Sequence, residues 1–286
     1  MNDGGFRREQ PRLHPYKFVN WVYPVNIIVT VKQVADPNIP PSHIELDPEA
    51  KRIVSPFGLP PVMNGYDANA LEAALALREK HGGRVTAVCL GDDTSREALK
   101  GAVAMGADSA VLLNDPDWLH ADSAGVGRAL AAAIRKIGSF DLILCGRQAS
   151  DTDGGQVLHW IAEALDLPAV SPVARIEESD GKNLTVHRLI EDGYQRLRVE
   201  LPALLGVSSE INEPRHPSVR GTMAAGRALI AGWKASDLGL QPAAPKVELR
   251  GLHIQLRTSK AELIVGSSGA AQGAALADKL HDLGLI

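Results

Sequence analysis

The sequence is poor in aromatic residues: four Phe, four Trp and four Tyr make up 4% of its 286 residues. A core with so few rings must be filled by Ala, Val, Leu and Ile, which suits helices packed on a parallel sheet. Proteins that bind single-stranded nucleic acid stack bases on aromatic side chains, so the composition argues against that function. A formal net charge of −4 also provides no basic surface to attract DNA or an anionic membrane.

Cysteine and long apolar runs are scarce as well. Two cysteines, Cys89 and Cys145, exclude a disulfide scaffold and any CxxC zinc or iron–sulfur site. No apolar run approaches the roughly 18 residues that cross a bilayer. Residues 1–24 contain basic side chains with no apolar stretch behind them, which excludes a secretory signal. We therefore expect an N-terminal extension at 1–24 and a cytoplasmic protein without membrane insertion.

Recognisable catalytic patterns are also missing. The nine histidines form no HxxxH or HxH pair, so a metal site is not expected. The sequence has no GxSxG nucleophile elbow, and no pair of carboxylates stands beside an evident base. It therefore predicts a protein that lacks a catalytic acid–base set of its own.

Buried strands and helices alternate through the first half of the chain. Runs rich in Val, Ile and Leu predict strands at 25–34, 84–91, 109–114 and 140–146. Stretches of Ala and Leu at helical spacing predict helices at 67–80, 94–105, 122–136 and 153–165. Thr94 and Glu97 would form a capping box at the start of the second helix. This alternation predicts an α/β fold with a doubly wound, mostly parallel sheet.

The pattern changes after Pro168. Four strand-like runs follow with little helix between them, at 169–177, 184–190, 194–201 and 203–209, and they predict an antiparallel hairpin at the sheet edge. Residues 212–245 are irregular. Residues 246–286 hold one strand-like piece, a glycine-rich stretch and one helix, too little to fold alone. We expect an α/β domain at 25–211, a linking segment at 212–245 and an extended C-terminal arm at 246–286.

Parallel α/β sheets bind ligands at the carboxyl ends of their strands, beside the switch point. The run GRQASDTDGGQ at 146–156 follows a predicted strand and leads into a helix, so its free amides could bind a phosphate. Asp151 or Asp153 could bond a ribose hydroxyl. Alternatively, Asp153 only caps the helix and the two following glycines relieve crowding. Cys89 ends the second strand and is a further candidate for ligand contact, whereas Cys145 is expected to be a small core residue.

Two other glycine-rich runs are weaker candidates for phosphate binding. Gly125 and Gly127 resemble the start of GxGxxG, but no strand precedes them, so we interpret them as a helix N-terminal turn. The run at 264–273 looks like a phosphate loop but lacks the Lys–Ser/Thr ending of a P-loop. We interpret it as a turn before the last helix.

Four stretches of the sequence resemble the β subunit of electron transfer flavoproteins. The first is Val31-Lys32-Gln33-Val34 with Asp36 after it, and the second is AVAMGAD at 102–108. The third is GRQASDTDGGQ at 146–156. The fourth is LPALLGVSSEINEPR at 201–215, which continues into PSVRGTM and, later, DLG at 237–239. Together they run from about residue 25 to 240, and the Leu-Pro-Ala…Asn-Glu-Pro-Arg block is the most specific.

The resemblance implies a Rossmann-like fold, similar to adenine-nucleotide alpha-hydrolases, in a heterodimer. An α subunit would hold the redox FAD, and this chain would complete that FAD site. This chain would also bind a structural AMP, or a second FAD as in electron-bifurcating relatives. Asp36 and Pro37 would lie toward the partner's flavin. Carried over by motif, the residues that contact the nucleotide would be Thr30, Ser55, Pro56, Phe57, Cys89, Gln148, Asp151, Asp153, Gly154, Gly155, Gln156 and Val157.

The resemblance also implies an electron carrier subunit rather than an enzyme in its own right. Val219 would lie in a loop at 212–245 that docks acyl-CoA or other flavin dehydrogenases, which donate electrons. A quinone oxidoreductase or similar protein would accept them. The arm at 246–286 would embrace the α subunit.

Three stretches depart from the family's pattern. The connection GLPPVMNG at 58–65 is longer than usual, and an Ala-rich run at 224–228 replaces a Lys-rich one. Asp-Thr-Asp-Gly-Gly at 151–155 is not a usual nucleotide loop, so AMP and FAD both stay open. The residues also leave open a stand-alone nucleotide-binding enzyme or sensor of the adenine-nucleotide alpha-hydrolase type. A third alternative is an interaction module whose nucleotide loop is vestigial.

Overall fold

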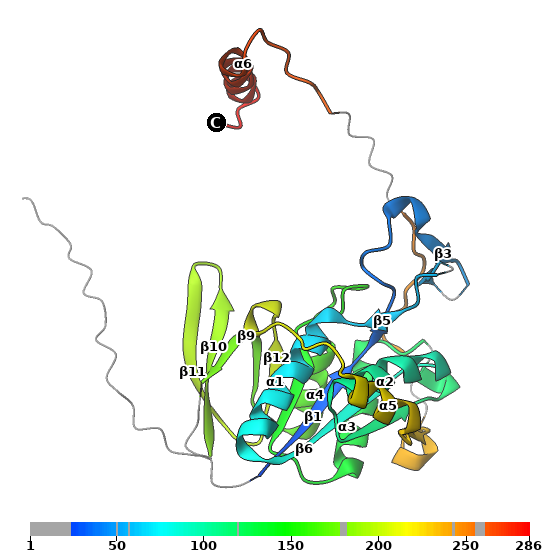
Figure 1. Ribbon diagram of the computed structural model, residues 1–286. Helices are drawn as coiled ribbons and strands as arrows, with labels where there is room; N and C mark the ends of the chain where they lie inside the picture. The colour runs from blue at the N-terminus through cyan, green and yellow to red at the C-terminus, as the bar shows by residue number, and fades with distance from the viewer. Residues whose placement is uncertain are drawn as a thin grey trace, which may run out of the picture. The chain divides into compact units, whose positions relative to one another are not determined.

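The computed structural model describes residues 24–49, 51–56, 58–118, 120–177, 182–241, 244–254 and 261–286. The chain divides into two compact units, the first ending at Arg250 and the second comprising Gly251–Ile286. The first unit contains the sheet and its covering helices (Figure 1). None of the helices in the described ranges is long and apolar enough to span a membrane.

The first unit is built on a nine-stranded sheet with the order β11-β10-β9-β12-β8-β1-β6-β7-β13. Neighbouring strands from β9 to β13 run parallel, whereas β10 and β11 add an antiparallel hairpin at one edge. This arrangement confirms the predicted α/β fold with a mostly parallel sheet. The strands are β1 (Val25–Val31), β6 (Gly83–Leu90), β7 (Ser109–Leu113), β8 (Leu142–Gly146), β9 (Ala169–Glu177), β10 (Asn183–Ile190), β11 (Gly193–Glu200), β12 (Ala203–Val207) and β13 (Ala231–Trp233).

Helices cover both faces of this sheet because its central strands are apolar on both sides. Along β1, Ile27 and Val29 belong to one apolar cluster while Ile28 belongs to another, as alternation along a strand requires. The first cluster includes residues of α1 (Gly65–His81) and α2 (Arg96–Met105), and the second includes residues of α3 (Ser123–Ile137) and α4 (Val157–Leu165). Aliphatic side chains dominate both clusters, as the shortage of aromatics predicts.

The chain reverses its direction of winding beside β1. From β1 it moves through β6 to β7, and α3 then leads it back to β8 on the other side of β1. Strands β1 and β8 pair only from Ile27 to Val29 and from Leu142 to Leu144. Beyond these residues the two carboxyl ends are not paired with each other, which is the geometry of a switch-point crevice.

Smaller elements complete the two units. Strands β2 (Gln33–Val34) and β5 (Val62–Met63) form one small sheet, and β3 (Glu45–Asp47) and β4 (Arg52–Val54) form another. Helix α5 (Val219–Arg227) packs on α2, and α6 (Gly269–Asp282) belongs to the second unit. The 3₁₀ turns are η1 (Pro41–His43), η2 (Asp93–Ser95), η3 (Pro116–Trp118), η4 (Ser209–Ile211) and η5 (Ser236–Leu238).

Several local predictions were wrong. Strand 25–34 is interrupted at Lys32, because β1 ends at Val31 and β2 pairs separately with β5. Thr94 forms no capping box, since its hydroxyl bonds to Gln33 and Asp92 and α2 begins only at Arg96. The segment 212–245 is not irregular throughout, because it contains α5 and β13. In the C-terminal arm, the described residues 246–254 and 261–268 form no strand before α6, in contrast to the predicted strand-like piece.

The last wrong boundary lies beside the candidate phosphate loop. Helix α4 begins at Val157 rather than at 153. Asp153 and Gly155 have φ values of 48° and 58°, in the left-handed region that does not continue a right-handed helix. Residues 147–156 therefore form an extended loop between β8 and α4. In contrast, Gly125 and Gly127 lie in the first turns of α3, as predicted.

Candidate functional site

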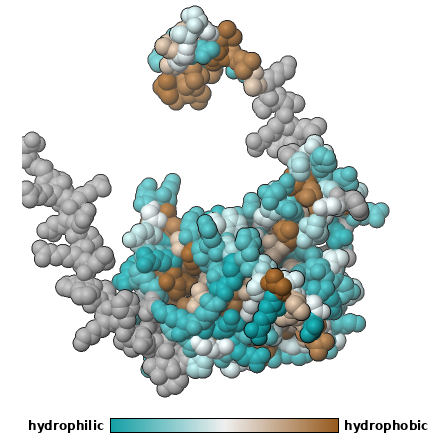
Figure 2. All heavy atoms as spheres, in the orientation of Figure 1, coloured by the Kyte–Doolittle hydropathy of each residue, from teal (hydrophilic) through white to brown (hydrophobic). Residues whose placement is uncertain are grey.

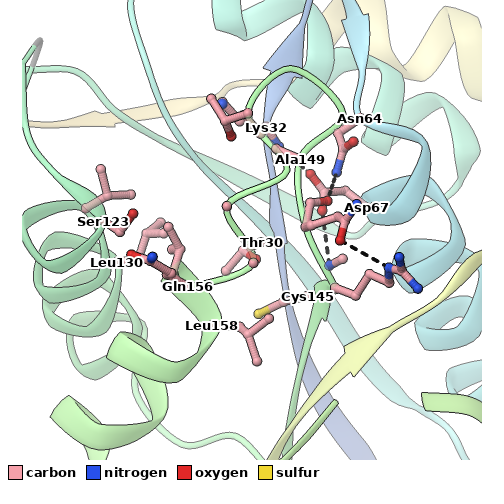
Figure 3. Close-up of a pocket in the computed structure, with 18 of the residues that line it drawn as sticks. Thr30, Lys32, Asn64, Asp67, Ser123, Leu130, Cys145, Ala149, Gln156 and Leu158 are labelled. Carbon is pink, nitrogen blue, oxygen red and sulfur yellow. Dashed lines mark hydrogen bonds between the residues drawn. The ribbon is translucent and has the colours of Figure 1, made fainter. Parts of the chain in front are cut away.

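A cavity of about 330 Å³ opens at the carboxyl ends of β1 and β8, within the size range of small-molecule sites. The starts of α3 and α4 supply its other wall. Figure 3 shows Lys32, Asn64 and Asp67 on one side and Ser123 and Leu130 on the other. The lining consists of Thr30, Val31, Lys32, Asn64, Asp67, Leu90, Ala121, Ser123, Val126, Leu130, Cys145, Gly146, Arg147, Gln148, Ala149, Thr152, Gly154, Gly155, Gln156, Val157 and Leu158.

Asp67 bridges the two strand ends where their pairing has stopped. It lies in the first turn of α1 and is only 6% exposed. Its Oδ2 accepts a hydrogen bond from the amide of Lys32 at 2.8 Å, and its Oδ1 accepts one from the amide of Gly146 at 3.0 Å. A Cβ at Gly146 would lie 2.3 Å from that Oδ1, so only glycine permits the approach. One carboxyl group thus replaces the missing strand-to-strand bonds.

Burial raises the pKa of Asp67 to about 7, and the amides of Lys32 and Gly146 together with the side chain of Asn64 oppose that shift. Removing a carboxylate from water disfavours its charge, whereas donated hydrogen bonds favour it. The carboxyl of Asp67 therefore exchanges its proton near neutral pH inside the cavity wall.

Asn64 connects the same two segments just before α1. Its side chain is fully buried. The backbone amide of Asn64 donates to the carbonyl of Lys32 at 2.9 Å, and its Nδ2 donates to the carbonyl of Gln148 at 2.9 Å. Its Oδ1 accepts the amide of Ser150 at 3.2 Å. Because a buried amide side chain with satisfied partners fixes backbone position, Asn64 holds the loop after β8 against the end of β1.

Charged and polar side chains stabilise the loop itself. The Nζ of Lys32 contacts both carboxylate oxygens of Asp151, at 2.7 and 2.6 Å. The Nε2 of Gln148 donates to the Oδ1 of Asp153 at 2.8 Å. In the described part of the chain, the backbone amides of residues 154–158 have no hydrogen-bond acceptor. These amides at the start of α4 form an arrangement suited to an anion such as phosphate.

The opposite wall is apolar and closely packed. Val126, Leu130 and Leu158 provide aliphatic surface next to the polar strand ends. Helices α3 and α4 approach closely at Gly127, where a Cβ would lie 2.4 Å from the Cβ of Trp160. A cavity with one apolar wall and one edge of amides suits a planar ring joined to a phosphate.

The structure brings some of the predicted site residues together and leaves others apart. Thr30, Gln148, Gly154, Gly155, Gln156 and Val157 line the cavity. Asp151 and Asp153 belong to the same loop, but their carboxylates bond to Lys32 and Gln148. Phe57 lies outside the described residues. The described predicted residues that are not part of the cavity lining, apart from these two aspartates, are Asp36, Pro37, Ser55, Pro56, Cys89 and Val219.

The predicted residues outside the lining lie in several different environments. Cys89 is fully buried in β6, and burial raises the pKa of its thiol to about 12. Asp36 caps a turn by accepting the amide of Asn38 at 2.8 Å. Pro37 follows it, and Ser55 and Pro56 follow β4. Val219 is 82% exposed at the start of α5. Cys145, which we expected to be a core residue, is 3% exposed and also lines the cavity.

Asn64 and Asp67 are the main site residues that the sequence reasoning missed. Ligand sites of parallel sheets are expected at the ends of strands, whereas these two residues stand at the start of helix α1. Their signal is present in the sequence: two polar residues precede a run of Ala and Leu, and both turn out to be buried. Buried Asn and Asp are uncommon without a specific partner.

The block at 212–215 stabilises α1 rather than the cavity directly. The guanidinium of Arg215 contacts Glu72 through its Nε at 2.7 Å and its Nη2 at 2.9 Å, and it also pairs with Glu79. Asn212 and Asn69 exchange side-chain-to-backbone hydrogen bonds of 2.8 and 3.0 Å. The pairing lowers the pKa of Glu72, chiefly through the hydrogen bonds from Arg215. These bonds hold residues 212–215, which precede α5, against α1.

Comparison with known proteins identifies the family. Residues 55–238 match the family described as "Electron transfer flavoprotein domain", which covers more than half of the chain. The chain belongs to the electron transfer flavoprotein family. A relative named "Electron transfer flavoprotein subunit beta" from Thermoanaerobacterium thermosaccharolyticum is 43% identical over 197 residues, covering 69% of this chain and 73% of that protein. The match confirms the resemblance found in the sequence motifs.

Two further relatives carry more specific names. The "Caffeyl-CoA reductase-Etf complex subunit CarD" of Acetobacterium woodii is 41% identical over 221 residues, covering 77% of this chain and 82% of that protein. "Protein FixA" of Azorhizobium caulinodans is 34% identical over 267 residues, covering 89% of this chain and 93% of that protein. The similarity to these relatives therefore extends over most of the chain.

Proposed function

We propose that this chain is the β subunit of a heterodimeric electron transfer flavoprotein and that its cavity binds AMP. The observation that carries the proposal is the cavity between β1 and β8, with amides at residues 154–158 free to hold a phosphate. The aliphatic side chains of Val126 and Leu130 offer a surface for the adenine ring. Thr30 and Lys32 also line the cavity, and we propose that they contact the ribose or the phosphate.

The C-terminal unit supports the heterodimer. Its helix α6 has no buried residue, and several large apolar side chains in and around this helix are exposed. Figure 2 shows hydrophobic side chains gathered on this small unit. The exposed residues are Leu263, Val265, Leu276, Leu283, Leu285 and Ile286. Apolar surface of this kind marks a protein interface, and we propose that the α subunit covers it.

We further propose that α5 meets electron-donating flavin dehydrogenases. Val219 and Met223, at 82% and 59% exposure, lie on the same helix four residues apart and so project from one face. In the complex, FAD bound mainly by the α subunit supplies the redox chemistry. The residues of this chain contribute binding and orientation, and a quinone oxidoreductase or similar protein accepts the electrons. Asp36 and Pro37 are proposed to face the partner's flavin.

The ligand can be identified directly. The full chain is purified, denatured by heat, and the released small molecules are analysed by mass spectrometry. We expect AMP in a ratio near one per chain, with no turnover of added ATP. FAD in place of AMP would correct the ligand and leave the subunit assignment intact. ATP turnover by the isolated chain would support the stand-alone nucleotide enzyme and refute the proposal.

The partner assignment has a separate test. Co-expression with a candidate α subunit should yield a yellow heterodimer, and a chain that never associates would refute the assignment. In that heterodimer, Val219→Asp should slow reduction by the donor dehydrogenase at least about tenfold, as expected for removing an interface anchor. The control Ile190→Asp changes an apolar residue of 41% exposure in the edge strand β10. Equal effects of the two substitutions would contradict docking at α5.

A further inference from the structure

Asp122 uses its two carboxylate oxygens for two different segments. Its Oδ1 accepts the amide of Gly125 at 2.8 Å and so caps the start of α3. Its Oδ2 accepts the amides of Lys246 and Val247, at 2.8 and 3.3 Å. The first interaction is an ordinary N-cap. The second joins residues 124 and 125 positions apart in the sequence, and helix capping does not require it.

The second segment, residues 244–250, is the linker that leads into the C-terminal unit. Few interactions hold this linker in place. Val247 is 72% exposed, and among the described residues the linker's hydrogen bonds and ion pairs go only to Asp122 and Lys51. The contact with Lys51 is a 3.5 Å ion pair with Glu248, whose side chain is 71% exposed, and such pairs contribute little. Asp122 is therefore the principal attachment of the linker.

The attachment lies at the cavity. Ala121 and Ser123, the neighbours of Asp122 in sequence, both line the cavity. The hydrogen bond from the Gly125 amide, together with the smaller contributions of the linker amides, holds the pKa of Asp122 below its usual range. The carboxylate is therefore charged at neutral pH, and hydrogen bonds to a charged acceptor are stronger than those to a neutral one.

We propose that Asp122 is a positioning residue that holds the linker at 244–250 beside the start of α3, so that the linker is already ordered when the α subunit binds the C-terminal unit. A flexible linker must be ordered when a partner binds, and that ordering costs affinity. A linker already held at its root loses less freedom on binding. The role rests on the proposed heterodimer, and it is separable from the N-cap, because each role uses its own oxygen.

The substitution Asp122→Asn separates the two roles. Asn is as good an N-cap as Asp, so its oxygen keeps the bond to Gly125. Its amide nitrogen is a donor and cannot accept from the amides of Lys246 and Val247. Asp122→Ser gives the same separation by shortening the side chain, since Ser also caps helices. The control Glu248→Gln removes only the weak ion pair with Lys51.

Hydrogen exchange of the full chain, followed by mass spectrometry, tests the attachment. In both Asp122 variants we expect faster exchange in peptides covering 244–250 and unchanged exchange in α3, with the melting temperature unchanged. Unchanged exchange at 244–250 would overturn the proposal, because the linker would then not depend on Asp122. Glu248→Gln should leave the exchange pattern close to that of the wild type.

Dissociation of the heterodimer tests the consequence. The α subunit is immobilised, and the release of the wild-type chain and the variants is followed by biolayer interferometry. We expect both Asp122 variants to dissociate roughly tenfold faster than the wild type, because a linker released from Asp122 must be ordered in the complex at the expense of affinity. If the wild type binds and the variants dissociate at its rate, the positioning role is refuted. If the wild type itself does not bind, the proposed heterodimer fails instead.

Discussion

Asp67 should make the folding stability of the chain depend on pH near neutrality. Its pKa is raised from 3.8 to about 7 by burial, so the folded state retains a proton that the unfolded chain has already lost. Stability is therefore highest where Asp67 is protonated in both states, below about pH 4. It decreases as the pH rises toward 7, and it levels off above that value. The substitution Asp67→Asn removes this titration while keeping the shape of the side chain.

The size of the effect follows from the two pKa values. Each unit of separation corresponds to about 1.4 kcal/mol, so between pH 5 and pH 8 the free energy of unfolding should fall by roughly 2–3 kcal/mol because of Asp67. The carboxylates with lowered pKa, such as Glu72 and Asp122, titrate below this window. Burial lowers the pKa of His81, so its contribution to the pH dependence of stability has the opposite sign to that of Asp67. Because His81 is present in both proteins, its contribution cancels when the free energy of unfolding of Asp67→Asn is subtracted from that of the wild type.

The assay is urea unfolding of the refolded, ligand-free full chain at pH 5, 6, 7 and 8, at constant ionic strength. The wild type should lose stability relative to Asp67→Asn across this range. Glu248→Gln, which removes an exposed carboxylate from the same chain, should follow the wild type. If Asp67→Asn has the same pH slope as the wild type, then Asp67 is not protonated in the folded cavity wall and the reasoning is refuted.

Three other substitutions have defined outcomes. Gly146→Ala places a Cβ 2.3 Å from the Oδ1 of Asp67, so it should lower stability by about 1–3 kcal/mol in thermal unfolding; a neutral effect would contradict the close approach. Arg215→Lys loses the two-pronged contact with Glu72 and should cost about 1–2 kcal/mol, whereas an unchanged urea midpoint would show that the contact is not stabilising. Lys32→Gln breaks an exposed ion pair and should change stability by less than about 1 kcal/mol while weakening AMP binding measured by calorimetry; unaltered affinity would remove Lys32 from the site.

The central sheet was predictable because its strands are short, continuous and apolar. A strand covered by helices on both faces must be apolar on both faces. A continuous apolar run such as 142–146 therefore predicts a buried central strand, and this strand is buried throughout. Helices α1, α2 and α3 end at glycines that stand in the sequence, such as Gly106 at the end of α2. The order of strand and helix then limits the topology to a few arrangements. These features depend on local sequence, so the order of strands and helices was predictable, although boundaries such as the start of α4 were not.

The elements that were missed depend on contacts between distant segments. Helix α5 is short, contains Gly221 and Gly226, and has little tendency to form alone. It packs on α2 so closely that a Cβ at Gly221 would lie 2.1 Å from the carbonyl oxygen of Ala104. Strand β13 has three residues and exists through pairing with β7. The roles of Asn64 and Asp67 likewise appear only when β8 is brought beside β1.

The unpaired carboxyl ends of β1 and β8 explain why α1 begins with polar residues. Where strand pairing stops, the amides of Lys32 and Gly146 still require acceptors, and Asp67 supplies them. The cavity can therefore exist only while the start of α1 stays in register with both strand ends. The contacts of Arg215 with Glu72 hold α1 from its outer face. The block at 201–215, the most specific of the family's motifs, thus supports the cavity indirectly, because Arg215 holds α1 in place. No residue of this block lines the cavity.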